Sequence, residues 1–70
     1  MTEQLSVGER PINLTQVLKL AGAVMHGGEA KSLIGDGLVR VNGEVELRKR
    51  RKMAVGDVVS IEGGPTLKLV

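Results

Sequence analysis

The stretch LVRVNGEVEL, residues 38–47, constrains the fold of this chain more than any other part of the sequence. Val39 and Val41 flank Arg40, which gives the two-residue period of a strand with one buried face. The Asn-Gly pair in the middle of the stretch readily adopts the positive φ angles of a tight hairpin turn. The alternation then continues with Val45 and Leu47. We therefore predict an antiparallel hairpin that buries the valines and turns Arg40 outward.

Two short helices are predicted upstream of the hairpin, over residues 14–21 and 29–36. Asn13 can cap the first helix with its side chain, and Gly22 stands where a left-handed stop would end it. Gly37 offers the same stop to the second helix. Helices of about two turns do not persist alone, so we expect them to be held by each other and by a sheet.

Three further strands are predicted, over residues 4–7, 58–61 and 66–70. The order of elements predicts an α+β fold in which two short helices pack on a small, mostly antiparallel sheet. We expect one domain spanning residues 1–70, since a chain of this length forms one domain at most. Met25 and Met53 are expected to fill gaps in its core.

The composition excludes several classes of protein. The 70 residues include no cysteine and one histidine, so neither a disulfide nor a His/Cys metal site is available. No apolar run approaches the roughly 20 residues of a membrane span, and the N-terminus lacks the pattern of a secretory signal. We expect a cytoplasmic protein without a cofactor or a membrane partner. The chain also lacks Phe, Tyr and Trp, on which single-strand binders usually stack bases.

Half of the ten Lys and Arg residues are consecutive, in the sequence RKRRK. One interpretation is a solvated loop whose charge protects a sheet edge. The other is a site for a polyanion, because adjacent like charges repel one another and only Glu44 and Glu46 lie near enough to offset them. Phosphate groups would relieve the repulsion and release counterions. Arginine grips phosphate with two bonds, so Arg48, Arg50 and Arg51 rank above Lys49 and Lys52.

Four residues outside this run are further candidates. Lys31 lies near the N-terminus of the second predicted helix, where its charge opposes the helix dipole and hints at a bound anion. Lys19 lies off the apolar stripe of the first helix, as most solubilising lysines do. Arg40 faces either RNA or only solvent. His26 has no recognisable nucleophile or metal partner, so it is either a plain loop residue or a neutral contact to RNA.

From residue 13 to residue 62, these features resemble the S-four-like RNA-binding domain family. The shared features are the first helix, a glycine-rich bend, EAKSLIGDGLVRVNGEV, the basic run and VGDVVSI. The chain looks like the small stand-alone members of this family, the YbcJ-like proteins. The resemblance implies the alpha-L motif, in which two helices and an L-shaped loop bind structured RNA. In larger relatives, fused domains supply catalysis.

The sequence therefore predicts a non-catalytic, monomeric RNA-binding protein. Its expected partner is structured RNA, either ribosomal or transfer RNA, with the ribosome as a candidate assembly. The alternative is a protein-interaction module that docks an acidic partner through the same basic run. An enzyme is disfavoured because no nucleophile–base pair, metal set or phosphate loop is recognisable. The predicted RNA-binding residues are Lys19, His26, Lys31, Arg40, Arg48, Lys49, Arg50, Arg51 and Lys52.

Overall fold

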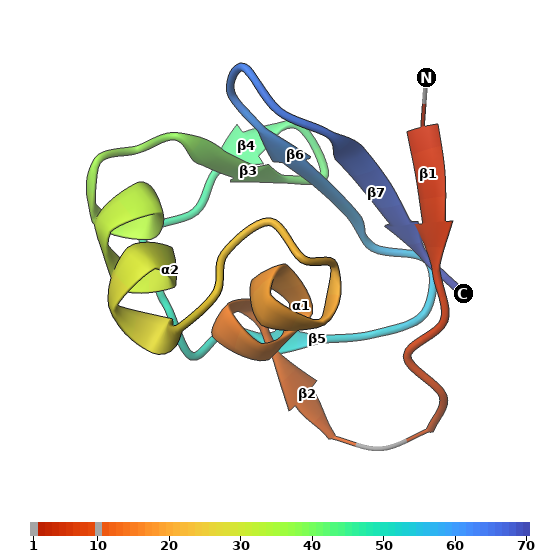
Figure 1. Ribbon diagram of the computed structural model, residues 1–70. Helices are drawn as coiled ribbons and strands as arrows, with labels where there is room; N and C mark the ends of the chain where they lie inside the picture. The colour runs from red at the N-terminus through yellow and green to blue at the C-terminus, as the bar shows by residue number, and fades with distance from the viewer. Residues whose placement is uncertain (1, 10) are drawn as a thin grey trace.

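The computed structural model describes residues 2–9 and 11–70, and it has two helices packed below a twisted sheet (Figure 1). This architecture confirms the predicted α+β class. The elements in chain order are β1 (Thr2–Leu5), β2 (Ile12–Asn13), α1 (Leu14–Leu20), α2 (Gly27–Gly35), β3 (Val39–Val41), β4 (Glu44–Val45), β5 (Lys52–Met53), β6 (Val58–Ile61) and β7 (Thr66–Leu69).

The main sheet has the strand order β1-β7-β6-β3-β4, and β2 and β5 form a separate antiparallel pair. Every pairing in the main sheet is antiparallel except that of β1 with β7, which is parallel. The first strand covers residues 2–5 rather than the predicted 4–7. Val7 is still buried, and its amide donates to the carbonyl of Val70. The terminal segments therefore meet at one edge of the fold.

The predicted hairpin turn is present, but its second arm is shorter than predicted. Asn42 has φ of 53° and Gly43 has φ of 87°, as a tight turn of this kind requires. The strand ends at Val45, and the chain then leaves the sheet. The expected continuation of the buried face through Val45 and Leu47 is therefore wrong, since these side chains are 49% and 63% exposed. Glu46, between them, is buried instead.

Both helices begin and end close to the predicted positions. Asn13 caps α1 through a reciprocal pair of bonds: its side chain accepts from the Gln16 amide, and the Gln16 side chain accepts from the Asn13 amide. α2 begins at Gly27, two residues before the predicted start. Gly22 and Gly37 both have φ of 74° and follow the two helices as expected. In the described residues, no helix combines the length and the apolar character needed to cross a membrane.

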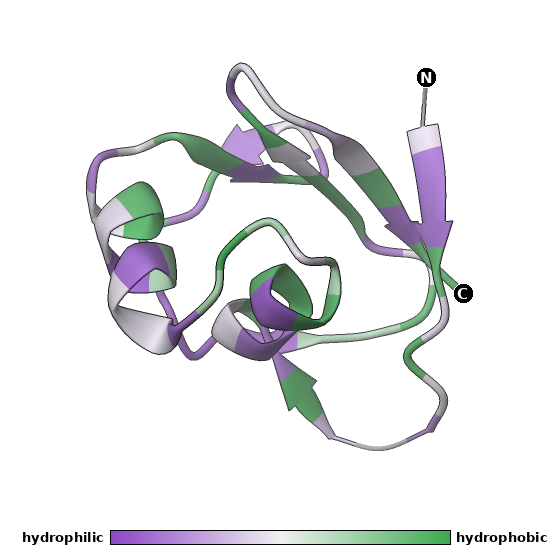
Figure 2. Cartoon of the chain, in the orientation of Figure 1, coloured by the Kyte–Doolittle hydropathy of each residue, from purple (hydrophilic) through white to green (hydrophobic). Residues whose placement is uncertain are grey.

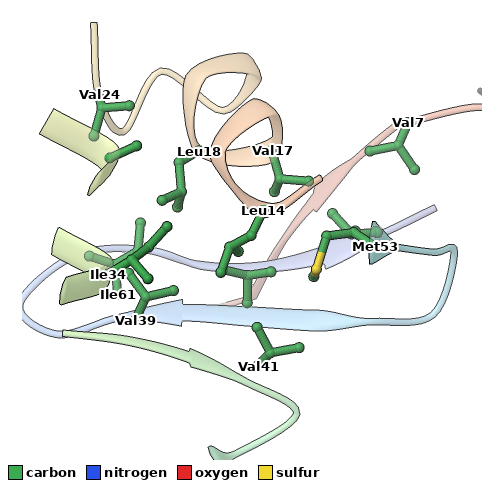
Figure 3. Close-up of a cluster of buried hydrophobic side chains, with 13 residues drawn as sticks. Val7, Leu14, Val17, Leu18, Val24, Ile34, Val39, Val41, Met53 and Ile61 are labelled. Atoms are coloured by element: carbon green, nitrogen blue, oxygen red, sulfur yellow. The ribbon is translucent and has the colours of Figure 1, made fainter. Parts of the chain in front are cut away.

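The core lies between the helices and the inner face of the sheet (Figure 3). Hydrophobic and hydrophilic positions alternate along β7, as Figure 2 shows, and Leu67 and Leu69 are its buried pair. Met53 is buried as predicted, but Met25 is 89% exposed, so its predicted role in the core is wrong. The connector between the helices turns Val24 inward, which leaves the next side chain facing solvent.

Candidate nucleic-acid interface

The basic run forms a turn rather than an extended strand. We call residues 48–51 the basic loop; Lys52, which follows, is the first residue of β5. The amide of Arg51 donates to the carbonyl of Arg48 across this turn, at 3.2 Å. The loop connects β4 to β5, and Figure 2 shows it as a hydrophilic segment that runs past α2 toward the start of α1. Its side chains therefore do not point alternately to two sides, as those of an extended run would.

The backbone of the basic loop is docked on the N-terminus of α1. The amide of Leu14 donates to the carbonyl of Arg51 at 3.0 Å, and the amide of Thr15 donates to the carbonyl of Lys49 at 3.2 Å. The Thr15 hydroxyl also donates to the Lys49 carbonyl, at 2.8 Å. The first amides of any helix lack partners within the helix, and here the loop supplies them. Helix and loop therefore position each other.

The buried carboxylate of Glu46 pairs with two arginines of the loop, Arg48 and Arg51. Arg48 donates through Nε to Glu46 Oε2 at 3.1 Å and through Nη2 to Oε1 at 2.9 Å. The Arg48 amide also donates to this carboxylate, and Arg51 Nη1 lies 3.4 Å from Oε1. The hydrogen bond from Arg48 lowers the pKa of Glu46 to about 2, although burial of the carboxyl acts in the opposite direction. The same bond raises the pKa of the Arg48 guanidinium.

Glu46 changes the charge balance expected from the sequence. From the sequence, Glu44 and Glu46 were expected to offset only part of the charge of the five cations. In the structure, Glu46 pairs with Arg48 and Arg51. Among the residues that the structure describes, no ion pair involves Lys49, Arg50 or Lys52. The uncompensated charge of the run therefore lies mainly on the two residues at the tip of the loop and on the residue after it.

Lys31 of α2 lies beside the tip of the basic loop, although 18 residues separate it from Lys49 in the sequence. An open hollow of about 290 Å³ separates the two elements, and Lys31, Lys49 and Arg50 line it. The rest of the lining comes from the starts of the two helices: Gly27 and Gly28 of α2, and Asn13, Thr15 and Gln16 at the start of α1. Three elements from different parts of the chain thus bring their cations and helix starts to one surface. We call this surface the cationic face.

The remaining predicted residues lie at other places. Arg40 projects from β3 on the face of the sheet away from the core, because Val39 and Val41 on either side of it are buried. Lys19 lines a separate shallow groove with Ile12 and Leu20. His26 precedes α2 and pairs with Glu29 of the same helix, with Nε2 and Oε1 3.1 Å apart. The structure therefore does not group Arg40 and Lys19 with the cationic face.

Glu46 and Thr15 fix the loop in place, and neither role was predicted from the sequence. Glu46 occupies the outward phase of a pattern in which Val45 and Leu47 were expected to point inward. The reversed burial follows from the chain leaving the sheet at Val45. The only sequence signal for the pairing of Glu46 was its position two residues before Arg48. Many exposed acid–arginine pairs have the same spacing, so this signal does not predict burial. The contact of Thr15 with residue 49 is long-range and leaves no local signal.

Comparison with known proteins identifies the family. The model of the S4 domain family matches residues 5–70. The chain belongs to the S4 domain family. The predicted resemblance is confirmed, and the match extends on both sides of residues 13–62. Membership of this family supports the prediction of a protein without catalytic activity.

Two relatives are more than 40% identical to this S4 domain protein over the aligned residues. One is the "Probable ribosome maturation protein RlbA" of Bacillus subtilis, 41% identical over 70 residues, covering 100% of this chain and 99% of the relative. The other is the "Putative RNA-binding protein YbcJ" of Escherichia coli, which is 44% identical over 59 residues. That alignment covers 83% of this chain and 84% of the relative.

A solved structure supports the same assignment. The solution structure of YbcJ from E. coli, described as revealing an alfaL motif involved in RNA-binding, matches with a TM-score of 0.73 and 40% identity. The match covers 96% of this chain and 85% of that one. The S4 domain protein therefore has the same fold as a YbcJ-like protein, with two helices on a mostly antiparallel sheet.

A metal centre has no support in the described part of the chain. Residues 2–9 and 11–70 contain no group of three or more His, Cys, Asp or Glu side chains that could hold a metal ion. Two of the described acids have structural partners: Asp57 accepts from the amide of Ala54 and the side chain of Asn42, and Glu46 holds the basic loop. The chemistry available at the cationic face is electrostatic binding.

Proposed function

We propose that this protein binds structured RNA through the cationic face. The observation that carries the proposal is the placement of Lys31 beside Lys49 and Arg50, on elements far apart in the sequence. None of these three cations has an acidic partner among the described residues, so each can pair with an anionic ligand without breaking an ion pair. The names of the relatives YbcJ and RlbA support RNA as that ligand.

The face suits the backbone of RNA rather than a particular base sequence. Lysine and arginine side chains contact phosphates, and such contacts fix position and orientation without reading sequence. The chain has no Phe, Tyr or Trp, which argues against binding extended single strands by stacking bases on such rings. We therefore expect folded or duplex RNA to be preferred, with recognition through shape, 2′-hydroxyls and phosphates.

Ribosomal RNA is the partner that we favour, in the cytoplasm. The support is the name of the B. subtilis relative, which refers to ribosome maturation. The alignment covers 99% of that relative. Transfer RNA is the other partner considered from the sequence. A panel of ribosomal RNA hairpins and transfer RNAs, compared at one salt concentration, would rank the two classes, because affinities measured at different salt concentrations cannot be compared.

The test is the salt dependence of RNA affinity in matched lysine variants. With about four phosphate contacts, the wild-type protein should show a slope of log affinity against log salt of about −3 to −4. Lys49→Ala should weaken binding to all RNAs and make this slope shallower by about one. Lys68→Ala is the control, because it removes the same charge from an exposed position in β7. Equal effects of the two substitutions would remove the proposal.

Purification from cells separates RNA binding from docking of an acidic protein. If the protein purifies from cells with nucleic acid that nuclease removes, RNA is the ligand of the face. A co-purifying acidic protein that survives nuclease treatment and is lost in Lys49→Ala would instead support the alternative.

A further inference from the structure

Arg48 is held differently from the other cations of the run. Its Nε and Nη2 both donate to the carboxylate of Glu46, while 74% of its side-chain surface remains exposed. Because one edge of the guanidinium is occupied, that edge cannot form the two-bond grip on a phosphate that free arginines form. The flat face of the group and its Nη1 end remain available. The carboxylate that fixes it is itself buried, so the plane is held in place.

Arg48 borders an open hollow of about 460 Å³ between α2 and the basic loop. Ile34, Gly35 and Leu47 provide an apolar part of its lining. Leu47 is 63% exposed, so a large apolar side chain faces solvent beside the fixed guanidinium. Lys31, Lys49 and Arg50 also line this hollow. An apolar floor, a fixed plane and a cationic rim together suit a flat, weakly polar group that is attached to an anion.

We propose that this hollow takes one unpaired nucleotide of a structured RNA, with its base stacked on the Arg48 guanidinium and against Leu47. Guanidinium planes are among the surfaces on which proteins stack bases that are splayed out of RNA loops and bulges. The chain has no Phe, Tyr or Trp to serve instead, and the ring of its one histidine, His26, pairs with Glu29 and does not line this hollow. The phosphate of the same nucleotide would lie toward Lys31 and Lys49. Glu46 is a positioning residue, since it acts by orienting Arg48.

The structure favours a nucleotide here because the hollow is formed before the ligand arrives. Glu46 fixes the side chain of Arg48, and α1 fixes the loop backbone through the carbonyls of Lys49 and Arg51. Little conformational freedom is therefore lost on binding. This inference rests on the proposed function, because it requires RNA to reach the cationic face. It adds that the face selects RNA with an unpaired base over a perfect duplex.

The test compares two RNA hairpins that differ only in one unpaired adenosine in the stem. Affinities are measured by fluorescence anisotropy, and the adenosine is also replaced by 2-aminopurine to report on stacking. The wild-type protein should prefer the bulged hairpin by about three- to fivefold, the worth of one exposed cation–π contact. Arg48→Lys keeps the charge but removes the plane, so the ratio should fall to about one and the 2-aminopurine signal should no longer change.

Two apolar variants provide a matched comparison that leaves Glu46 and Arg48 paired. Leu47→Ser should reduce the preference for the bulged hairpin. Val55→Ser should not, because Val55 is 62% exposed, like Leu47, but lines a different part of the surface. Circular dichroism checks that each variant is folded.

Two results would overturn the inference: equal affinity of the wild-type protein for both hairpins, or an unchanged ratio in Arg48→Lys. The first would still leave RNA binding by the cationic face intact. Binding to neither hairpin would overturn the proposed function together with this inference, so the two failures are distinguishable.

Discussion

Replacing Glu46 with Gln should destabilise the protein in a pH-dependent manner. The substitution keeps the size of the side chain but removes the charge that pairs with Arg48 and Arg51. The pKa of Glu46 is lowered from 4.5 to about 2 in the folded state, mainly by the hydrogen bond from Arg48. A shift of this size sets an upper limit of roughly 3 kcal/mol on its contribution to stability.

The expected loss is smaller than this limit because water reaches the pair. Glu46 is 7% exposed, but the Arg48 side chain is 74% exposed, so solvent screens their attraction. We expect Glu46→Gln to lower the free energy of unfolding by about 1 to 2 kcal/mol at pH 7. For a domain of this size, that corresponds to a melting temperature lower by about 5 to 15 °C.

The pH dependence follows from the direction of the pKa shift. A lowered pKa stabilises the folded state above the unfolded pKa, near 4.5, and this stabilisation is lost as pH falls toward 2. The difference in stability between the wild-type protein and Glu46→Gln should therefore be constant above about pH 5.5 and shrink steadily below it.

The assay is urea unfolding followed by far-ultraviolet circular dichroism, because the chain has no Trp or Tyr to follow by fluorescence. Glu44→Gln is the matched control: Glu44 lies two residues earlier, is exposed and has no ion pair within the described residues. We expect the control to change stability by less than about 0.5 kcal/mol. Equal losses in the two variants, or a difference that does not vary with pH, would refute the role assigned to Glu46.

Three further substitutions test the fold. Asn13→Ala removes the reciprocal cap of α1 and should cost about 1 kcal/mol by urea unfolding; no change would mean that the cap contributes nothing. Gly43→Ala places a side chain at φ of 87° in the hairpin turn and should lower stability by about 1 to 2 kcal/mol, whereas a neutral result would contradict the turn geometry. Met25→Ser should change stability by less than about 0.5 kcal/mol, and a larger loss would show that Met25 is buried after all.

Local signals in the sequence were sufficient to predict most of the fold. The cap at Asn13, the stops at Gly22 and Gly37 and the turn at residues 42–43 each depend on the conformation of a few neighbouring residues. Such features can be recognised from residue type and spacing. The end of β4 could not, because the alternation of apolar residues continues to Leu47 although the strand ends at Val45. The Glu46 amide donates to the carbonyl of Val39, and the Glu46 side chain holds the basic loop.

The candidate site was predictable in composition but not in geometry. The run of cations was visible, and Lys31 was singled out by its unfavourable place near a helix N-terminus. The arginines were ranked above the lysines because a guanidinium grips phosphate with two bonds, and the pairing of Arg48 and Arg51 with a buried acid was not visible. A variant in which Arg48, Arg50 and Arg51 are all replaced with Ala would test this pairing. Such a variant would leave the carboxylate of Glu46 buried without its partners and should lose stability as well as affinity.

The most direct measurement is an NMR titration of the labelled protein with a ribosomal RNA hairpin. At 7.4 kDa, the protein is small enough for its amide signals to be followed residue by residue. The proposed cationic face predicts that amides of residues 27–31 and 48–52 shift together on adding RNA, while those around Arg40 and Lys68 on the outer face of the sheet do not. Shifts confined to the outer face of the sheet would contradict it.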